Sequence, residues 1–295
     1  MNVFEWFWKK VTKPQDEKRI KTLRVPVVAK ELNDIPYLSS DHIHHRLDVY
    51  SPTTDDTPMP TIIDIHGGGW YYGDKELNKI YCLNLCERGF KIVNISYRLA
   101  PSVSLKTQVQ DIVSALNHIK EHASEYGIDL NNLFITGDSA GAHLTSLIVN
   151  LVSDGDMQAA YGVNIDLKFK AVAYTCAIFD ISKLATMPVV KSYFTPLFEK
   201  KGAKCDVFPY SCFRPEFSGG IPSLFITCDG DFLKGQTVSG YETYRALGHD
   251  AELIYFPKAE QTNPLAHVYN VIQPDWAESK VANDRTADFF RRYVD

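Results

Sequence analysis

The sequence lacks a long hydrophobic run, a strong surplus of charge of one sign, and an excess of glycine or proline. No stretch approaches the roughly 18 apolar residues that a membrane-spanning helix requires. The 295 residues carry a formal net charge of −5 and the pI is about 6.0, which disfavours a dedicated nucleic-acid-binding protein. Gly and Pro number 17 and 15, too few for a fibrous chain, and 45% of the residues are hydrophobic. A chain of this length and composition can form a full hydrophobic core without disulfide or metal staples.

Cysteine does not occur in the patterns that would give it a structural or metal-binding role. Two of the cysteines are four residues apart in a predicted helix, where a local disulfide is geometrically unfavourable, and two others each end a predicted strand, as buried free thiols do. We therefore expect reduced cysteines, no bound metal and a cytoplasmic location. The six residues are Cys82, Cys86, Cys176, Cys205, Cys212 and Cys228.

The N-terminal residues combine aromatic and basic side chains. The first thirty residues hold eight Lys or Arg against three acidic residues, which leaves the rest of the chain at −10. Glu5 interrupts the aromatic stretch and no long apolar core follows, so a secretion signal is not expected. An i, i+3, i+4, i+7 spacing predicts an amphipathic helix that docks on the body of the protein, and binding to a membrane surface is the alternative. The residues with this spacing are Phe4, Phe7, Trp8 and Val11.

Helical segments alternate with short β-branched runs along the body of the chain. Because these runs are almost fully apolar, they predict strands buried on both faces, as in a parallel sheet. The alternating segment 45–50 predicts an early antiparallel strand. Together they predict an α/β fold whose mostly parallel central sheet is flanked by helices. The predicted strands are 61–65, 90–96, 133–136, 170–175, 223–228 and 252–256, and the predicted helices are 82–88, 109–126, 142–152 and 241–247.

The chain has neither an internal repeat nor a flexible linker, so we expect one domain over residues 1–295. Residues 181–220 form its irregular part, with four prolines and the Gly219–Gly220 pair. An irregular stretch of this length inside a domain is usually functional. We expect it to form a small cap or lid over an active site, together with the N-terminal segment 1–30.

A candidate nucleophile lies in Gly137-Asp138-Ser139-Ala140-Gly141, which matches the pattern G-x-S-x-G. The predicted strand 133–136 precedes the motif, and the predicted helix 142–152 follows it. A strand, a sharp turn and a helix are the context in which this pattern exposes a serine hydroxyl. The helix N-terminus behind the serine would direct amide dipoles toward developing negative charge.

Three consecutive glycines follow the predicted strand 61–65, in His66-Gly67-Gly68-Gly69-Trp70. Such a run leaves the backbone free to direct N–H groups at an oxyanion. A phosphate-binding turn is the alternative. Neither G-x-x-x-x-G-K-[ST] nor G-x-G-x-x-G after a first strand occurs, however. We therefore expect an oxyanion loop and no cofactor.

A serine nucleophile requires a base and an acid that orients the base, in the chain order serine, acid, histidine for a G-x-S-x-G turn. His267 follows the last predicted strand and precedes the C-terminal helix, which is where the base is expected. His249 follows a helix stop and is typical of a surface residue. Beyond Ser139 and its helix, these two are the available histidines.

The acid is expected directly after the predicted strand 223–228, where Asp229 and Asp231 stand. Asp231 lies further into the loop and is the preferred acid. Asp229 stays an alternative, although it can instead bind the backbone of the turn. Asp180, after the preceding strand, is a weaker candidate and is expected to order a loop.

Other conspicuous polar residues are expected to have structural roles. His143 lies four residues after Ser139 and is expected to pack or cap locally, and Asp138 is expected to anchor nearby backbone. Arg98 is expected to form an ion pair beside the site. A histidine cluster without further metal-ligand spacing predicts a solvated strand edge, not a metal site. Its members are His42, His44 and His45.

With these motifs the chain resembles the hormone-sensitive-lipase-like carboxylesterases of the α/β-hydrolase superfamily. The resemblance rests on His66–Trp70 with the following Gly73-Asp74, on Tyr97–Pro101 and on Gly137–Gly141. It covers about residues 45–155 and, less closely, 223–267. It implies an α/β-hydrolase fold. It also implies that His66 is a structural support for the glycine loop.

The resemblance also implies a complete set of catalytic roles. Ser139 would be the nucleophile, Asp231 the acid and His267 the base. The oxyanion hole would consist of three backbone amides, those of Gly68, Gly69 and Ala140.

We therefore predict a serine carboxylesterase that hydrolyses small, short-acyl esters through an acyl-enzyme intermediate. An arylformamidase-type amidase and a carbohydrate deacetylase on the same site are alternatives. A non-catalytic small-molecule receptor is an alternative of another class, which a complete set of Ser, Asp and His disfavours. We expect a small-molecule ester as the partner, with no nucleic acid and no transmembrane segment, and a homodimer stays open.

Overall fold

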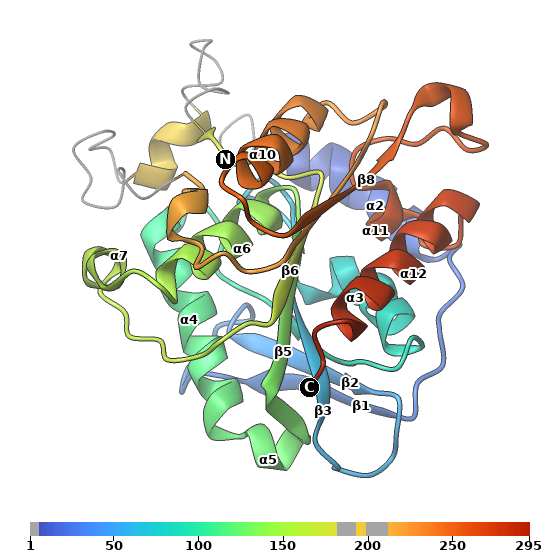
Figure 1. Cartoon of the computed structure of the whole chain (residues 1–295). Helices are drawn as coiled ribbons and strands as arrows, with labels where there is room; N and C mark the ends of the chain where they lie inside the picture. The colour runs from blue at the N-terminus through green and yellow to red at the C-terminus, as the bar shows by residue number, and fades with distance from the viewer. Residues whose placement is uncertain (1–5, 182–192, 199–211) are drawn as a thin grey trace.

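A twisted central sheet separates two layers of helices (Figure 1). The computed structural model describes residues 6–181, 193–198 and 212–295. Within these residues the sheet has eight strands in the order β1-β2-β4-β3-β5-β6-β7-β8. β2 is antiparallel to both of its neighbours, and every other pair is parallel. The strands are β1 (Lys30–Pro36), β2 (Arg46–Ser51), β3 (Met59–Ile65), β4 (Lys91–Ile95), β5 (Ile128–Asp138), β6 (Ala171–Thr175), β7 (Ser223–Cys228) and β8 (Ala251–Phe256).

The helices of the described residues include short 3-10 turns and one π-helical segment. The α-helices are α2 (Lys13–Ile20), α3 (Lys75–Cys86), α4 (Leu105–Glu121), α5 (Ala123–Tyr126), α6 (Ala140–Leu151), α7 (Gly155–Tyr161), α10 (Lys234–Ala246), α11 (Tyr269–Ile272) and α12 (Ala277–Arg291). The other segments are the π-helix η1 (Trp8–Thr12) and the 3-10 turns η2 (Thr195–Phe198), η5 (Pro215–Phe217) and η6 (Lys258–Glu260). No helix within the described ranges is long and apolar enough to cross a membrane.

The core lies on both faces of the sheet because successive side chains of a strand point to opposite faces. In β3, Ile62 packs with residues of α3 and α12, whereas Ile63 and Ile65 pack with residues of α4 and α6. The strand is buried on both sides, as its apolar run predicts. The predicted α/β fold with a mostly parallel sheet is confirmed.

The predicted elements differ from the observed ones mainly at helix starts. α4 begins at Leu105, four residues before its prediction, because the side chain of Ser104 caps it by accepting a hydrogen bond from the Thr107 amide. The apolar stripe from which the helix was predicted begins only at Val109. β1 was not predicted, because it is an edge strand whose residues are exposed or half-buried. Such a strand has no apolar run.

The N-terminal helix contacts the body of the protein through a different face from the predicted one. Trp8 stacks on Tyr72 with ring centroids 5.4 Å apart, so docking of Trp8 is confirmed. Phe7 is 47% exposed, so its predicted burial is wrong. The reason is the π-helical turn, in which the Lys13 amide binds the Trp8 carbonyl five residues back and shifts the helical register. Phe4 and Cys205 lie outside the described residues, as do the parts 1–5, 182–192 and 199–211 of the predicted cap.

The prediction that the histidine cluster is a solvated strand edge holds for His42 but is wrong for His45. His42 is exposed, but His45 is buried, with Nδ1 2.5 Å from Ser40 Oγ and Nε2 3.6 Å from Asp111 Oδ2. Asp111 also pairs with Arg98 at 2.6 Å, so the ion pair predicted for Arg98 is confirmed. His45 is buried in contact with Asp111, which lies far from it in sequence.

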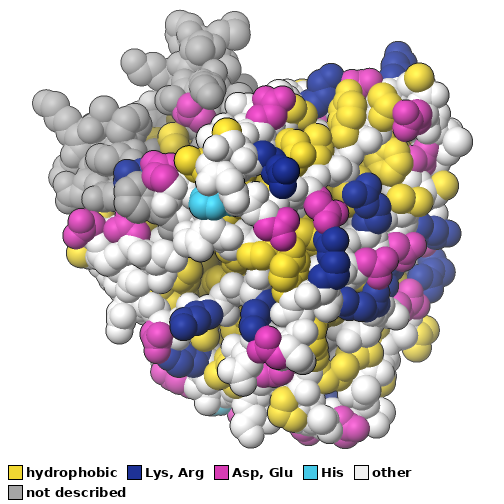
Figure 2. All heavy atoms as spheres, in the orientation of Figure 1, with side chains coloured by type: hydrophobic (Ala, Val, Ile, Leu, Met, Phe, Trp, Pro, Cys, Tyr) yellow, Lys and Arg dark blue, Asp and Glu magenta, His cyan; other side chains and the backbone are white. Residues whose placement is uncertain are grey.

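Charged side chains of both signs are interspersed on the face seen in Figure 2. Among the described residues, exposed ion pairs include Arg292 with Glu252 and Arg291 with Asp288. Exposed pairs of this kind contribute little to stability, at roughly 0–1 kcal/mol each. The two layers of apolar core, not these pairs, hold the helices on the sheet.

Candidate active site

Ser139 occupies a sharp turn between the end of β5 and the start of α6. Its backbone angles are φ 53° and ψ −118°, a conformation that non-glycine residues adopt rarely and that a surrounding fold must enforce. The Ser139 amide donates to the Thr175 carbonyl at 2.9 Å, which ties the turn to the neighbouring strand β6. A Cβ on Gly141 would lie 2.0 Å from the Ile65 carbonyl oxygen, so the last glycine of the motif permits close packing of α6 on β3.

The structure brings the three predicted side chains into one hydrogen-bonded chain. His267 Nε2 lies 2.9 Å from Ser139 Oγ, and His267 Nδ1 lies 2.7 Å from Asp231 Oδ1. The three residues follow β5, β7 and β8, whose carboxyl ends meet at the same edge of the parallel sheet. With Nδ1–H donated to the carboxylate, Nε2 can accept the serine hydroxyl proton.

Asp231 is held in place from several sides. Its side chain accepts hydrogen bonds from the Leu233 amide at 2.9 Å and from the Thr227 hydroxyl at 2.7 Å. Burial acts to raise the pKa of Asp231, but the bonds from His267, Leu233 and Thr227 outweigh it, and the pKa lies below its ordinary value. The carboxyl group is therefore ionised at neutral pH and its orientation toward His267 is fixed.

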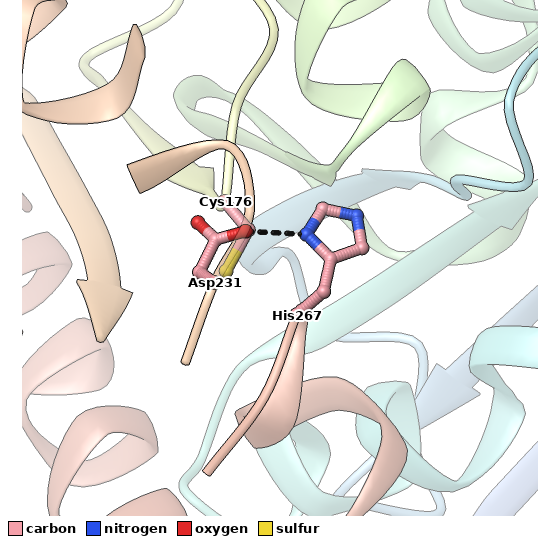
Figure 3. Close-up of side chains that lie close together, drawn as sticks. All are labelled: Cys176, Asp231 and His267. Carbon is pink, nitrogen blue, oxygen red and sulfur yellow. Dashed lines mark hydrogen bonds and ion pairs between the residues drawn. The ribbon is translucent and has the colours of Figure 1, made fainter. Parts of the chain in front are cut away.

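Cys176 lies beside this pair, as Figure 3 shows, with its sulfur close to Asp231. Ligand atoms of Cys176, Asp231 and His267 lie within 4.8 Å of one another, the one such cluster found among the described residues. The thiol accepts a hydrogen bond from the Val268 amide at 3.2 Å, and burial raises its pKa. A metal would need a thiolate and would break the Asp231–His267 bond, so the cluster fits a packing contact better than a metal site.

The alternative acids and the alternative base contact other residues. Asp229 accepts from Lys234 Nζ at 2.7 Å and from the Lys258 amide at 2.7 Å, so its backbone partner lies in η6 and the predicted contact with its own turn is wrong. Asp180 contacts Cys212 at 3.5 Å, and His249 packs on the ring of Tyr244 with centroids 4.7 Å apart.

The side chain of Asp138 anchors the backbone of the glycine loop, residues 66–70. The Gly67 amide donates to Asp138 Oδ1 at 2.9 Å, which confirms that Asp138 anchors nearby backbone. Gly68 and Gly69 have φ of +105° and +60°, values that a side chain would disfavour. His66 is buried, and its Nδ1 lies 2.8 Å from the Gly67 carbonyl oxygen. Burial lowers the pKa of His66 to about 4, so its ring is neutral.

A buried polar cluster under the loop was not predicted from the sequence. Asn78 Nδ2 donates to Asp64 Oδ2 at 2.9 Å and to Asp138 Oδ1 at 2.8 Å. Burial and the charge of Asp138 raise the pKa of Asp64 to about 8, so Asp64 carries a proton at neutral pH. A sequence signal for this cluster was available in Asp64, a charged residue inside the otherwise apolar run 61–65.

A cavity of about 510 Å³ opens at Ser139 and His267. Gly68 and Gly69 form part of its lining, and aromatic and aliphatic side chains form most of its walls. Trp70 is buried against His143, to which its indole nitrogen donates at 3.3 Å, so local packing of His143 is confirmed. The remaining walls include Trp8, Tyr72, Ile178, Tyr193, Phe194, Phe232, Val271 and Ile272.

The fold, the strained serine turn and the positions of the three side chains define the class of protein as an α/β-hydrolase. The sequence profile of the BD-FAE family matches residues 47–203, slightly more than half of the chain. The chain belongs to this family, within the hormone-sensitive-lipase-like esterases.

A solved structure supports the same conclusion over the full chain. Esterase B from Lactobacillus rhamnosis, determined with a C4-C4 SN3 tributyrin phosphonate, has a TM-score of 0.90 and 30% sequence identity. The similarity covers 98% of this chain and 94% of that chain.

Two curated relatives match more limited segments. A probable carboxylic ester hydrolase, LipM, of Mycobacterium tuberculosis is 31% identical over 58% of this chain, and kynurenine formamidase of Salmo salar is 30% identical over 44%. The matched segments cover 39% and 42% of those two proteins, so the chain spans less than half the length of these curated relatives.

Proposed function

We propose that the protein is a serine carboxylesterase that acts through an acyl-enzyme intermediate. The observation that carries the proposal is the hydrogen-bonded chain of Ser139, His267 and Asp231, which opens on an apolar cavity beside the Gly68–Gly69 turn. Nucleophile, base and orienting acid in this geometry are the requirements for acyl transfer.

In the first step His267 removes the hydroxyl proton as Ser139 Oγ attacks the acyl carbonyl carbon. The resulting imidazolium is stabilised by the ionised Asp231, which also keeps Nε2 directed at the serine. His267 then returns the proton to the leaving alcohol. His267 then removes a proton from water as the water attacks the acyl-enzyme. The acyl–Oγ bond breaks, the carboxylic acid leaves, and His267 returns the proton to Ser139 Oγ.

The negative charge on the tetrahedral intermediate would be stabilised by the backbone amides of Gly68, Gly69 and Ala140. Ala140 is the first residue of α6, so its amide belongs to the positive end of a helix dipole. Each such donor typically contributes about 3 kcal/mol to transition-state stabilisation.

The substrate class we propose is small esters with short acyl chains. A cavity of about 510 Å³ shared between the acyl group and the alcohol accommodates a compact ester. The bound tributyrin phosphonate of Lactobacillus rhamnosis esterase B favours acyl groups of similar size. A series of p-nitrophenyl esters from acetate to palmitate tests this choice. We expect kcat/KM to be highest at four carbons or fewer, and a maximum at long chains would contradict it.

A formamidase-type amidase is the second candidate, favoured by the similarity to kynurenine formamidase over 129 residues. The same groups would attack a formamide carbonyl, with His267 protonating the leaving amine. Parallel assays of an aryl formamide and the matching aryl ester distinguish the two activities, since the natural class should show the higher kcat/KM.

Substitution of the nucleophile tests the mechanism for both candidates. We expect Ser139→Ala to abolish hydrolysis of p-nitrophenyl acetate and labelling by a fluorophosphonate, with the thermal melting temperature little changed. His267→Ala should lose most of the activity, whereas the matched variant His249→Ala should keep it. Undiminished turnover by Ser139→Ala would exclude the mechanism.

A further inference from the structure

Two aromatic side chains from distant segments lie against the outer side of the glycine loop. The Tyr193 hydroxyl donates to the Gly69 carbonyl oxygen at 2.6 Å, and the Trp8 indole nitrogen donates to the same hydroxyl at 3.3 Å. A Cβ on Gly69 would lie 2.3 Å from the Tyr193 oxygen and 2.8 Å from the Trp8 ring. Trp8 belongs to the N-terminal helix, and Tyr193 belongs to the predicted cap.

The contacts fix the peptide groups that flank the two loop amides. On one side the Gly67 amide is bound by Asp138 at 2.9 Å, and on the other side the Gly69 carbonyl is bound by Tyr193. The amides of Gly68 and Gly69 belong to the two peptide groups between these points. The carbonyls of these two groups are also held, that of Gly67 by His66 Nδ1 at 2.8 Å and that of Gly68 by the Tyr71 and Tyr72 amides. Tyr193 therefore completes the restraint of the loop at its Gly69 end.

Tyr193 and Trp8 are themselves well anchored. The Tyr71 hydroxyl donates to the Tyr193 carbonyl oxygen at 2.6 Å, and Trp8 stacks on Tyr72 with the ring planes 11° apart. Burial raises the pKa of Tyr193, so its hydroxyl keeps the proton that it donates to Gly69. The Trp8 indole, being a donor only, orients that hydroxyl by occupying its acceptor site.

The geometry points to Tyr193 and Trp8 as positioning residues that hold the Gly68 and Gly69 amides in the orientation that binds the oxyanion. This inference rests on the proposed function. It assigns the N-terminal helix and the segment 193–198 a part in the chemical step, through the loop, in addition to forming cavity walls.

The test compares Tyr193→Phe with Tyr126→Phe on p-nitrophenyl acetate. Both variants remove a tyrosine hydroxyl that forms a hydrogen bond, but Tyr126 does not line the cavity and its hydroxyl lies 3.0 Å from His118 Nε2. We expect Tyr193→Phe to lower kcat about tenfold with KM within twofold, because a loosened amide weakens transition-state binding more than substrate binding. Tyr126→Phe should leave both kcat and KM within twofold. Trp8→Phe, which keeps an aromatic ring, should lower kcat about threefold.

A second readout separates positioning from general packing. A trifluoromethyl ketone forms a tetrahedral adduct that carries an oxyanion, so its inhibition constant for Tyr193→Phe should rise by the same factor as kcat falls. An unchanged kcat with a raised KM would overturn the inference and leave Tyr193 as a cavity wall. Equal losses of kcat in Tyr193→Phe and Tyr126→Phe would also overturn it. Ser139→Ala is assayed alongside, since activity in that variant would reject the proposed function itself.

Discussion

At the residue scale, the two carboxylates of one loop differ in what they bind. Asp231 binds His267, whereas Asp229 binds Lys234 and the backbone amide of Lys258 in η6. We predict that Asp231→Asn lowers kcat about 10⁴-fold, because the amide would no longer fix the histidine tautomer or stabilise the imidazolium. Asp229→Asn should retain kcat within severalfold. Steady-state kinetics on p-nitrophenyl acetate compares them, and the reverse ranking would assign the acid to Asp229.

A close backbone contact requires glycine at position 141, the last residue of the G-x-S-x-G motif. A Cβ on Gly141 would lie 2.0 Å from the Ile65 carbonyl oxygen, and main chain cannot move as a flexible side chain does. We therefore predict that Gly141→Ala lowers the free energy of unfolding by several kcal/mol. Overpacking alone typically costs about 1–3 kcal/mol.

Gly235 in α10 provides the matched control for this substitution. A Cβ there would meet nothing within 4 Å, so Gly235→Ala should raise the free energy of unfolding by about 0.5–1 kcal/mol. Urea denaturation of both variants measures the difference. If Gly141→Ala proves as stable as the parent protein, α6 does not pack as closely on β3 as the structure shows.

The three members of the proposed triad were predictable because their positions depend on strand order. Parallel strands place their carboxyl ends at one edge, so a serine, an aspartate and a histidine that follow three parallel strands of one sheet are brought to that edge. The contact of Tyr193 and Trp8 with Gly69 could not be predicted from the sequence. Their approach to Gly69 depends on a π-helical turn and on contacts across more than 120 residues, neither of which leaves a periodic signal.

At the scale of elements, β3, α3 and β5 each contribute one residue to the buried cluster of Asp64, Asn78 and Asp138. Because Asp64 has a pKa of about 8 when folded and about 3.9 when unfolded, the folded state binds an extra proton between these values. Raising the pH through this window therefore favours the unfolded state. The stability that neutral Asp64 confers is complete below about pH 4 and is lost as the pH approaches 8.

We predict that Asp64→Asn, which stays uncharged, flattens this dependence. The free energy of unfolding, from urea titrations between about pH 5 and pH 8, should fall less steeply for the variant than for the parent protein. Asp229→Asn serves as the control, because hydrogen bonds from Lys234 and Tyr255 lower the pKa of Asp229 and place its titration below the window. Parallel curves for Asp64→Asn and the parent protein would contradict the raised pKa.

At the scale of the whole molecule, the site is assembled from both ends of the chain. The N-terminal helix is tied to α11 by Arg19, whose guanidinium donates to the Ile272 carbonyl at 2.7 Å. Trp8, Thr12 and Asp16, at intervals of four residues, face the cavity. The sequence predicted that this basic, aromatic segment would dock and form part of a cap over the active site. It did not reveal which of its side chains face the cavity, because that depends on the helical face that the π turn presents.

The reactivity of the cysteine thiols depends on how closely the whole molecule is packed. Cys82, Cys86, Cys176 and Cys228 are buried free thiols, and burial raises the pKa of each one, to about 12 for Cys86 and about 11 for Cys228. Since the thiolate is the reactive form, we predict that iodoacetamide modifies these four only after unfolding. Cys212, which is half-buried, should react in the native protein. Mass spectrometry of peptides alkylated with and without urea measures this, and rapid native labelling of Cys176 would show that solvent enters beside Asp231.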